Sequence, residues 1–161
     1  MGKFLQLLVC TALLLGPSLA CADDFLVIGQ VHQVTVLPKG HSRCKVPCPP
    51  NKICISNSCG CAEASVTPQQ TLLGKAPGSL IVSEHLDEWC RIPMPPNEDP
   101  ILVFGKPDGT LQWSYLNSSG TNSNPRFEAE RFNSIGGVLI RQLPAVDGEV
   151  ELGELKRRLG L

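Results

Sequence analysis

The sequence predicts a mostly β fold: a small OB-type Greek-key barrel with a disulfide-rich loop insertion and a C-terminal α-helix. Its 161 residues include 15 Gly, 14 Pro and only 5% aromatic residues, a composition that favours short strands and turns over long helices. Roughly five short apolar runs are separated by irregular connections that contain Gly and Pro. One connection holds five of the eight cysteines and has little apolar content, so disulfides must hold it in place.

The longest predicted strand covers residues 25–36. It is rich in β-branched side chains, and Gly29 interrupts their alternation, which indicates a bulge or a sharp bend. A second strand-like run covers residues 62–72 and is broken at Pro68. A third strand is expected over residues 79–82, after a turn rich in Gly and Pro.

The clearest local signal is a β-hairpin. Residues 101–104 form an uninterrupted apolar run that is typical of a buried strand. Residues 106–109, with the sequence Lys-Pro-Asp-Gly, supply turn chemistry, because Pro fixes φ and Gly accepts a positive φ. Residues 111–115 then alternate apolar and polar side chains, as a strand does. Upstream, residues 83–89 fit either one helical turn or a continued strand.

The C-terminal part predicts two helices and one more strand. Pro125 at a first helical position favours a short helix over residues 126–132, and residues 138–143 read as a last strand. Asp147 is expected to cap a terminal helix over about residues 148–160, whose charges match the helix dipole. The apolar stripe of this helix consists of Leu152, Leu155 and Leu159, and Gly160 is its expected stop.

The start of the chain has the pattern of a signal peptide. Lys3 is the only charge before Asp23, and an apolar run over residues 4–15 leads to small residues that end at Ala22. The apolar run is too short to span a bilayer, which needs about 20 residues, and no later segment qualifies. We therefore expect residues 1–22 to be removed and the protein to be secreted or periplasmic.

Two other N-termini stay open. Cleavage after Ala20 would leave Cys21 as the first residue. A bacterial lipoprotein would also begin at Cys21, with a lipid anchor on that cysteine, although Ser18 stands where the lipobox usually has Leu. We expect cleavage after Ala22, which gives a single domain over residues 23–161. Its 13 Lys and Arg against 15 Asp and Glu give a net charge of −2, so we expect no nucleic-acid or membrane partner.

Cysteine parity favours cleavage after Ala22, and then a lipid-anchored Cys21, over a free Cys21 at the N-terminus. Loss of Cys10 with the signal peptide, and removal or acylation of Cys21, leave an even set, which in an exported chain predicts a disulfide framework. The six cysteines of this set are Cys44, Cys48, Cys54, Cys59, Cys61 and Cys90.

Several short motifs match a known family in order and spacing. They are Ile28-Gly29-Gln30-Val31, Leu73-Gly74-Lys75, Leu80-Ile81-Val82, Cys90, Ile101-Leu102-Val103-Phe104 and Asp108-Gly109-Thr110-Leu111. With this spacing, residues 27–116 resemble a netrin-like domain, the OB barrel of tissue inhibitors of metalloproteinases and of many exported bacterial proteins. The resemblance implies an OB scaffold in which the cysteine-rich segment, about residues 38–61, is an insertion between the first two strands.

The pairing of Cys90 follows partly from this resemblance. The family often has a cysteine just after the last hairpin strand, where this chain has residues 117–121 without one, so Cys90 needs a new partner. By parity, one cysteine of the cluster must bond Cys90 if all six are paired within one chain. Cys59 and Cys61 are not expected to bond each other, because the ring would be too small. Cys61, next to the second strand, is the expected partner of Cys90.

No catalytic motif is recognisable. The three histidines do not belong to a hydrolase, metalloprotease or phosphate-binding motif. His32 lies on a predicted strand and is interpreted as a surface or core residue. His41 precedes Cys44 and Cys48, so a zinc site is conceivable, but an oxidising compartment favours disulfides. We therefore expect a protein that is not an enzyme and has no metal and no cofactor; Trp89 and Trp113 are interpreted as core residues.

A run of basic residues lies in the segment that disulfides would hold rigid. Rigid loops on a stable scaffold are common binding sites, whereas in the alternative interpretation these charges only keep a proline-rich loop soluble. The candidate binding residues are Lys39, His41, Arg43, Lys45 and Lys52. They would take another protein or an anionic extracellular ligand as partner.

Two functions compete at this point. The first is an exported, non-enzymatic binding protein that acts through the disulfide-stapled loop. The alternative, implied by the resemblance, is a metalloproteinase inhibitor of the tissue-inhibitor type, which would chelate the zinc of the protease with the amino group and carbonyl of an N-terminal Cys21. The N-terminal C-x-C pair of that family is absent, because residue 23 is Asp.

Overall fold

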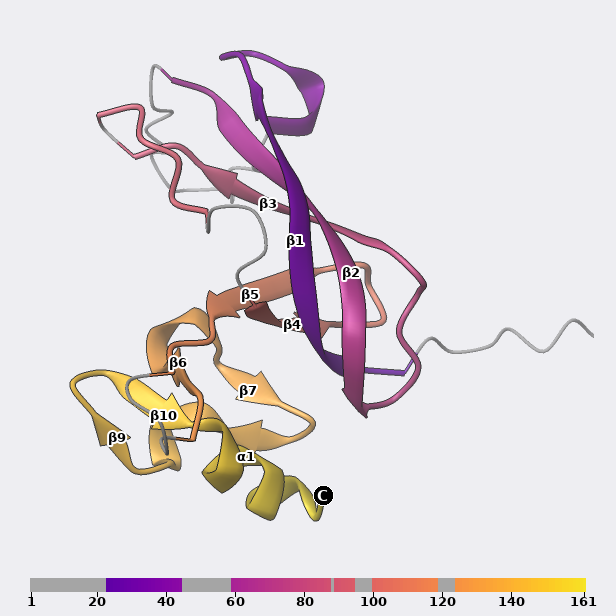
Figure 1. The fold of residues 1–161 in the computed structure, drawn as a ribbon, viewed down its shortest axis with the longest axis vertical. Coiled ribbons are helices and arrows are strands. Elements are labelled where there is room, and N and C mark those ends of the chain that lie inside the picture. The colour runs from indigo at the N-terminus through magenta and orange to yellow at the C-terminus, as the bar shows by residue number, and fades with distance from the viewer. Residues whose placement is uncertain (1–22, 45–58, 88, 95–99, 119–123) are drawn as a thin grey trace, which may run out of the picture.

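The computed structural model describes residues 23–44, 59–87, 89–94, 100–118 and 124–161. The fold is mostly β, and its main element is a five-stranded antiparallel sheet in the order β3-β2-β1-β4-β5 (Figure 1). Its strands are β1 Phe25–Leu37, β2 Cys61–Leu73, β3 Leu80–His85, β4 Pro100–Gly105 and β5 Leu111–Tyr115. The predicted signal peptide, and with it the choice of N-terminus and the role of Cys21, lie outside the described residues.

The sheet is open, so the predicted barrel is not closed. In the described part of the chain no ladder joins the two edge strands, β3 and β5. The reason is that β3 and β4 pair with different parts of the long ribbon formed by β1 and β2. β4 pairs with residues 25–30 of β1, whereas β3 pairs with residues 61–66 of β2, which lie beside the other end of β1. The strands β3 and β4 therefore pair with opposite ends of the ribbon.

The predicted bulge in β1 is confirmed. The register between β1 and β2 shifts between Ile28 and Gly29, and a Cβ on Gly29 would overlap the side chain of Val66. The predicted break at Pro68 is wrong, because β2 runs through it. Pro68 lies opposite Gly29 and beyond Val66, the last residue of β2 that pairs with β3. A proline is tolerated there because β2 has a neighbour on one side only.

Of residues 83–89, for which the sequence left strand and helix open, residues 83–85 continue the third strand, since β3 ends at His85. The predicted hairpin is confirmed. Its turn is closed by hydrogen bonds from the Gly109 N–H to the Lys106 carbonyl (3.0 Å) and from the Lys106 N–H to the Thr110 carbonyl (2.9 Å). Gly109 adopts a φ of 84°, as its place in the turn requires.

The sheet buries both of its faces, which explains the uninterrupted apolar run of β4. Ile101 and Val103 join one core cluster with Trp113 of β5 and with apolar residues of β1, β2 and β3. Leu102 and Phe104 point to the other face and join a second cluster built largely from residues 127–155. A strand covered on both sides needs apolar side chains at every position.

The C-terminal segment covers the second face with short elements (Figure 1). They are β6 Arg126–Glu128, η2 Ala129–Arg131, β7 Ser134–Ile135, β8 Val138–Leu139, η3 Ile140–Gln142, β9 Ala145–Val146, β10 Glu149–Glu151 and α1 Leu152–Leu159. Two predictions are wrong here. Residues 126–132 are not one helix: β6 pairs with β10 and buries Phe127, and only residues 129–131 form a short 3-10 helix, η2. The strand over residues 138–143 ends at Leu139, where η3 turns Ile140 into the core.

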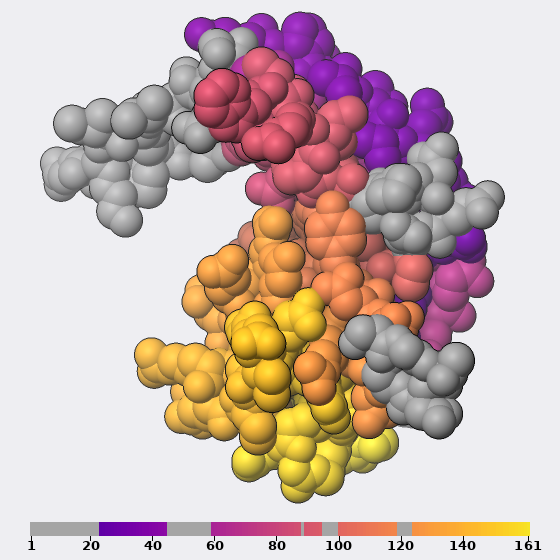
Figure 2. All heavy atoms as spheres, turned by 60° about the vertical axis from the view of Figure 1, so that its left-hand side comes forward, coloured from indigo at the N-terminus to yellow at the C-terminus, as the bar shows by residue number. Residues whose placement is uncertain are grey.

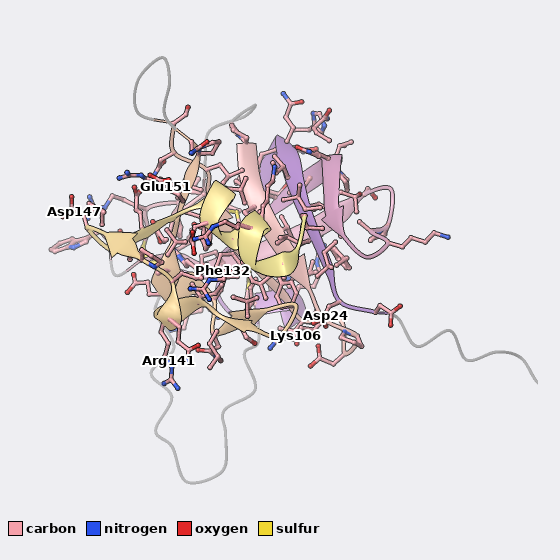
Figure 3. All side chains as sticks on the ribbon, turned by 90° about the horizontal axis from the view of Figure 1, so that it is seen from below. Asp24, Lys106, Phe132, Arg141, Asp147 and Glu151 are labelled. Atoms are coloured by element: carbon pink, nitrogen blue, oxygen red, sulfur yellow. A yellow bond between two sulfur atoms is a disulfide. The ribbon has the colours of Figure 1, made fainter. Side chains whose placement is uncertain are left out.

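The terminal helix is confirmed, but it begins later than predicted. Asp147 is not its cap: it has a φ of 53° in the turn between β9 and β10 and lies away from α1 (Figure 3). The helix begins at Leu152, next to the β6–β10 pair, where the Leu152 N–H donates to the carbonyl of Pro125 (2.8 Å). Gly160, with a left-handed φ of 75°, ends it as predicted.

We expect the Leu155→Ala variant to lower the free energy of unfolding by roughly 2–5 kcal/mol, because Leu155 is fully buried in the second core cluster. The control is Leu161→Ala, at an exposed leucine beyond the helix, which should change it by less than about 0.5 kcal/mol. Equilibrium denaturation measures both. Equal stabilities of the two variants would show that α1 is not docked.

Candidate binding surface at the disulfide-linked end of the sheet

Among the described residues, two disulfides lie at one end of the sheet. They join Cys44 to Cys61 and Cys59 to Cys90, with Cα atoms 5.4 and 5.2 Å apart. Parity correctly required one cysteine of the cluster to bond Cys90, and Cys59 and Cys61 are indeed not bonded to each other. Cys48 and Cys54 lie outside the described residues.

The expected partner of Cys90 was wrong by two positions. Cys61 is the first residue of β2 and pairs across the sheet with Leu37 and His85. Side chains two residues apart on a strand share a face, and Arg43 contacts Glu63 on this strand. The side chains of Cys61 and Glu63 therefore point to the same face of β2, which is the face that the turn ending at Cys44 covers. Cys59 precedes the strand and is the cysteine that bonds Cys90.

Residues 38–44 form a tight turn that begins where β1 ends. The His41 N–H donates to the Pro38 carbonyl (3.1 Å), and the Cys44 N–H donates to the His41 carbonyl (3.0 Å), within the short helix η1 Ser42–Cys44. The Arg43 N–H also donates to Nδ1 of His41 (3.3 Å). His41 is thus part of the turn, and Lys39 is exposed at its tip.

The structure separates the predicted binding residues by role. Arg43 forms an ion pair of 2.7 Å with Glu63, whose side chain is only 9% exposed. A nearly buried carboxylate needs a partner, so Arg43 has a structural role in addition to its exposed surface. Lys39 has no carboxylate partner among the described residues and remains a candidate contact. Lys45 and Lys52 lie outside the described residues.

Gly60 joins the turn of residues 38–44 to the segment that follows β3. Its φ is 97°, and its carbonyl accepts a hydrogen bond from the Leu86 N–H (3.3 Å). A Cβ at this position would overlap the carbonyl oxygen of Leu37 and lie 2.8 Å from the carbonyl carbon of Pro38. The backbone of residues 37–39 therefore packs directly on Gly60, which only glycine permits.

A second tight turn, residues 87–91, follows β3 and is organised by Asp87. Oδ1 of Asp87 accepts hydrogen bonds from the N–H groups of Trp89 (2.9 Å) and Arg91 (2.8 Å), and Oδ2 accepts one from Nε of Arg91 (3.0 Å). The bond from the Arg91 N–H is the main cause that lowers the pKa of Asp87 below its usual value. Cys90, with a φ of 58°, links this turn to Cys59.

Trp89 is displayed by this turn, and its interpretation as a core residue was wrong. Its side chain is 71% exposed, whereas Trp113 is 4% exposed in the first core cluster, as predicted. Ile92, just beyond the turn, is 47% exposed. Sequence reasoning missed Trp89 because it treated a large aromatic as core. The available signal was the charged residues on both sides of it.

The two turns share one end of the molecule. We call residues 37–44, 59–61 and 85–91 the disulfide-linked end; residue 88 within it is not described. The space-filling view shows the pink segment of β3 and the residues after it beside the purple C-terminal part of β1 and its turn, with the orange and yellow C-terminal segment on the opposite side of the molecule (Figure 2). Gly60 and the disulfides hold both turns against the ends of β1, β2 and β3.

Arg131 of η2 ties the C-terminal segment to both edges of the sheet. Its NH1 atom lies 2.9 Å from Oε2 of Glu84 on β3, and its Nε atom lies 2.9 Å from Oε2 of Glu128. The guanidinium also stacks 5.3 Å from the ring centre of Trp113 on β5. The strand β3, which leads into the Trp89 turn, is therefore held by its ladder with β2 and by the ion pair between Glu84 and Arg131.

A concave region lies in the C-terminal segment. It has a volume of about 490 Å³ and is lined by Glu128, Ala129, Glu130, Asp147, Gly148 and Glu149. Glu128 is already paired with Arg131, and Glu149 accepts a hydrogen bond from Nδ2 of Asn117 (2.5 Å). No group of three or more His, Cys, Asp or Glu is arranged to hold a metal ion in the part of the chain that the structure describes.

Comparison with known proteins finds no family model, no curated protein and no solved structure that matches the chain. The helices of the described residues include none that is long and apolar enough to cross a membrane.

Proposed function

We propose that the chain is an exported, non-enzymatic binding protein whose contact surface is the disulfide-linked end of the sheet. One observation carries this proposal: two exposed turns, residues 38–44 and 87–91, are fixed next to each other. The first packs on Gly60, the Leu86 N–H just before the second donates to the Gly60 carbonyl, and each turn has a disulfide. Preorganised turns lose little conformational entropy when a partner binds, so rigid loops on a stable scaffold favour binding.

The proposed scaffold is an OB-type sheet of the netrin-like kind. The strand order β3-β2-β1-β4-β5 supports it, since an OB fold is a five-stranded, partly open Greek-key barrel. The shared core supports it as well, because Leu80 of β3 and Trp113 of β5 belong to the same cluster although no ladder joins their strands. Ligands of OB folds contact the loop between the first two strands, which here is the disulfide-linked segment.

Export is part of the proposal. Disulfides persist in oxidising compartments, and the two described here support a secreted or periplasmic protein. The proposed partner is another protein or an anionic extracellular ligand, which the exposed Lys39 at the tip of the first turn would contact.

The test compares two charge reversals. Immobilised Lys39→Glu should capture roughly three- to tenfold less partner than the wild-type chain from the extracellular or periplasmic fluid of the source, because a charge at the rim of an interface steers association. Lys75→Glu is the matched control, since Lys75 is an exposed lysine in the connection after the far end of β2. It should leave capture unchanged.

Arg43 is unsuitable for this test. A carboxylate there would face Glu63 and destabilise the turn whether or not the surface binds anything. Equal capture by the wild type, Lys39→Glu and Lys75→Glu would contradict the proposed contact surface.

A further inference from the structure

We infer, on the basis of the proposed function, that Trp89 is the anchor residue of the disulfide-linked end and that it docks into an apolar pocket on an acidic protein surface. Of the two tryptophans, Trp113 fills the core and Trp89 is 71% exposed. The fold does not use the indole of Trp89, although it devotes a disulfide and the side chain of Asp87 to the turn that carries it.

The rigidity of the turn favours an anchor. The N–H groups of Trp89 and Arg91 are held by Asp87, and the Cys90 N–H donates to the Asp87 carbonyl (3.0 Å). The turn is bounded by buried residues, Leu86 before it and Met94 after it. A tryptophan on such a turn has little freedom left to lose on binding, and tryptophan and arginine are enriched among the residues that dominate interfaces.

The exposed charges of the disulfide-linked end indicate an acidic partner. Arg91 and Arg43 have side chains that are 73% and 54% exposed, whereas their carboxylate partners, Asp87 and Glu63, are 37% and 9% exposed. The cationic member of each pair is therefore the more exposed one. Lys39 adds an exposed positive charge to the same end. A complementary surface carries Asp and Glu around an apolar pocket large enough for an indole.

The experiment selects ligands from a phage-displayed library of random linear peptides on the immobilised full chain. We expect the enriched peptides to combine Asp or Glu with apolar residues. One enriched peptide, made synthetically, should shift the emission of Trp89 to shorter wavelength as the indole leaves water. Because hot-spot tryptophans contribute strongly to binding, Trp89→Ala should bind this peptide about thirtyfold more weakly. Trp89→Phe should keep part of the affinity.

The matched control is Val146→Ala, which removes an exposed apolar side chain from β9 in the C-terminal segment and should bind as the wild type does. Enrichment of basic peptides, or of none, would overturn the inference. Binding that is weakened by Lys39→Glu but not by Trp89→Ala would also overturn it while leaving the proposed function standing. Binding that neither variant changes would contradict both.

Discussion

The Gly60→Ala variant should lose roughly 2–6 kcal/mol of unfolding free energy. Two costs add at this position. A φ of 97° is strained for any residue with a Cβ, which costs about 1–3 kcal/mol, and the overlap with the backbone of Leu37 and Pro38 adds about 1–3 kcal/mol. The neighbours that would have to move are backbone atoms, so a change of side-chain rotamer cannot relieve the contact. Equilibrium unfolding in urea measures the loss.

Gly40→Ala is the control for this prediction. Gly40 lies in the turn of residues 38–44 that packs on Gly60 and has a φ of 82°, but a Cβ there would meet no atom within 4 Å. Its substitution should cost only about 1–2 kcal/mol, from the left-handed backbone alone. The difference between the two variants isolates the close packing on Gly60. Equal losses would show that the two turns are not held together there.

Removal of the Cys59–Cys90 disulfide is expected to have the second large effect. The bond closes a loop with a sequence separation of 31, and the chain-entropy estimate for such a loop is roughly 3.5 kcal/mol of stability. The double variant Cys59→Ala, Cys90→Ala should therefore unfold at a lower denaturant concentration. It should also leave Trp89 on a turn held by Asp87 alone, so the peptide enriched in the phage selection should bind more weakly.

The second disulfide provides the comparison. Cys44→Ala with Cys61→Ala opens a loop with a separation of 17 and should cost roughly 3 kcal/mol, but it leaves the link to the Trp89 turn intact. Peptide affinity should thus fall with loss of the Cys59–Cys90 bond and hold after loss of the other bond. The opposite order would contradict the assignment of the Trp89 turn as the contact.

Local sequence signals predicted the elements that local interactions specify. The hairpin turn around Gly109 and the stop of α1 at Gly160 both depend on residues next to one another, and both were predicted. The helix expected over residues 126–132 was wrong for the opposite reason. The partner of Arg126 in the β6–β10 ladder is Glu151, distant in the sequence, and a strand of three residues has too short a pattern to recognise.

The proposed binding surface could be predicted only in outline. The cysteines indicated the connection between β1 and β2, and parity tied that connection to Cys90. Which cysteine reaches Cys90 depends on the face of β2 that Cys61 occupies, and this follows from the register with β1 and β3. The role of Arg43 depends likewise on its ion pair with Glu63. The sequence predicted that Glu63 lies on a strand but not that its side chain is nearly buried beside Arg43.

Hydroxyl-radical footprinting of the native, disulfide-bonded protein tests the central claim most directly. The protein is oxidised alone and in complex with the partner that it captures from its own extracellular or periplasmic fluid, and the modified residues are read by mass spectrometry. Trp89 should be oxidised readily in the free protein, because it is exposed, and should be protected in the complex, while Val146 at the exposed β9 strand keeps its reactivity. Protection of Val146 with Trp89 unchanged would place the contact surface on the C-terminal segment and contradict the account.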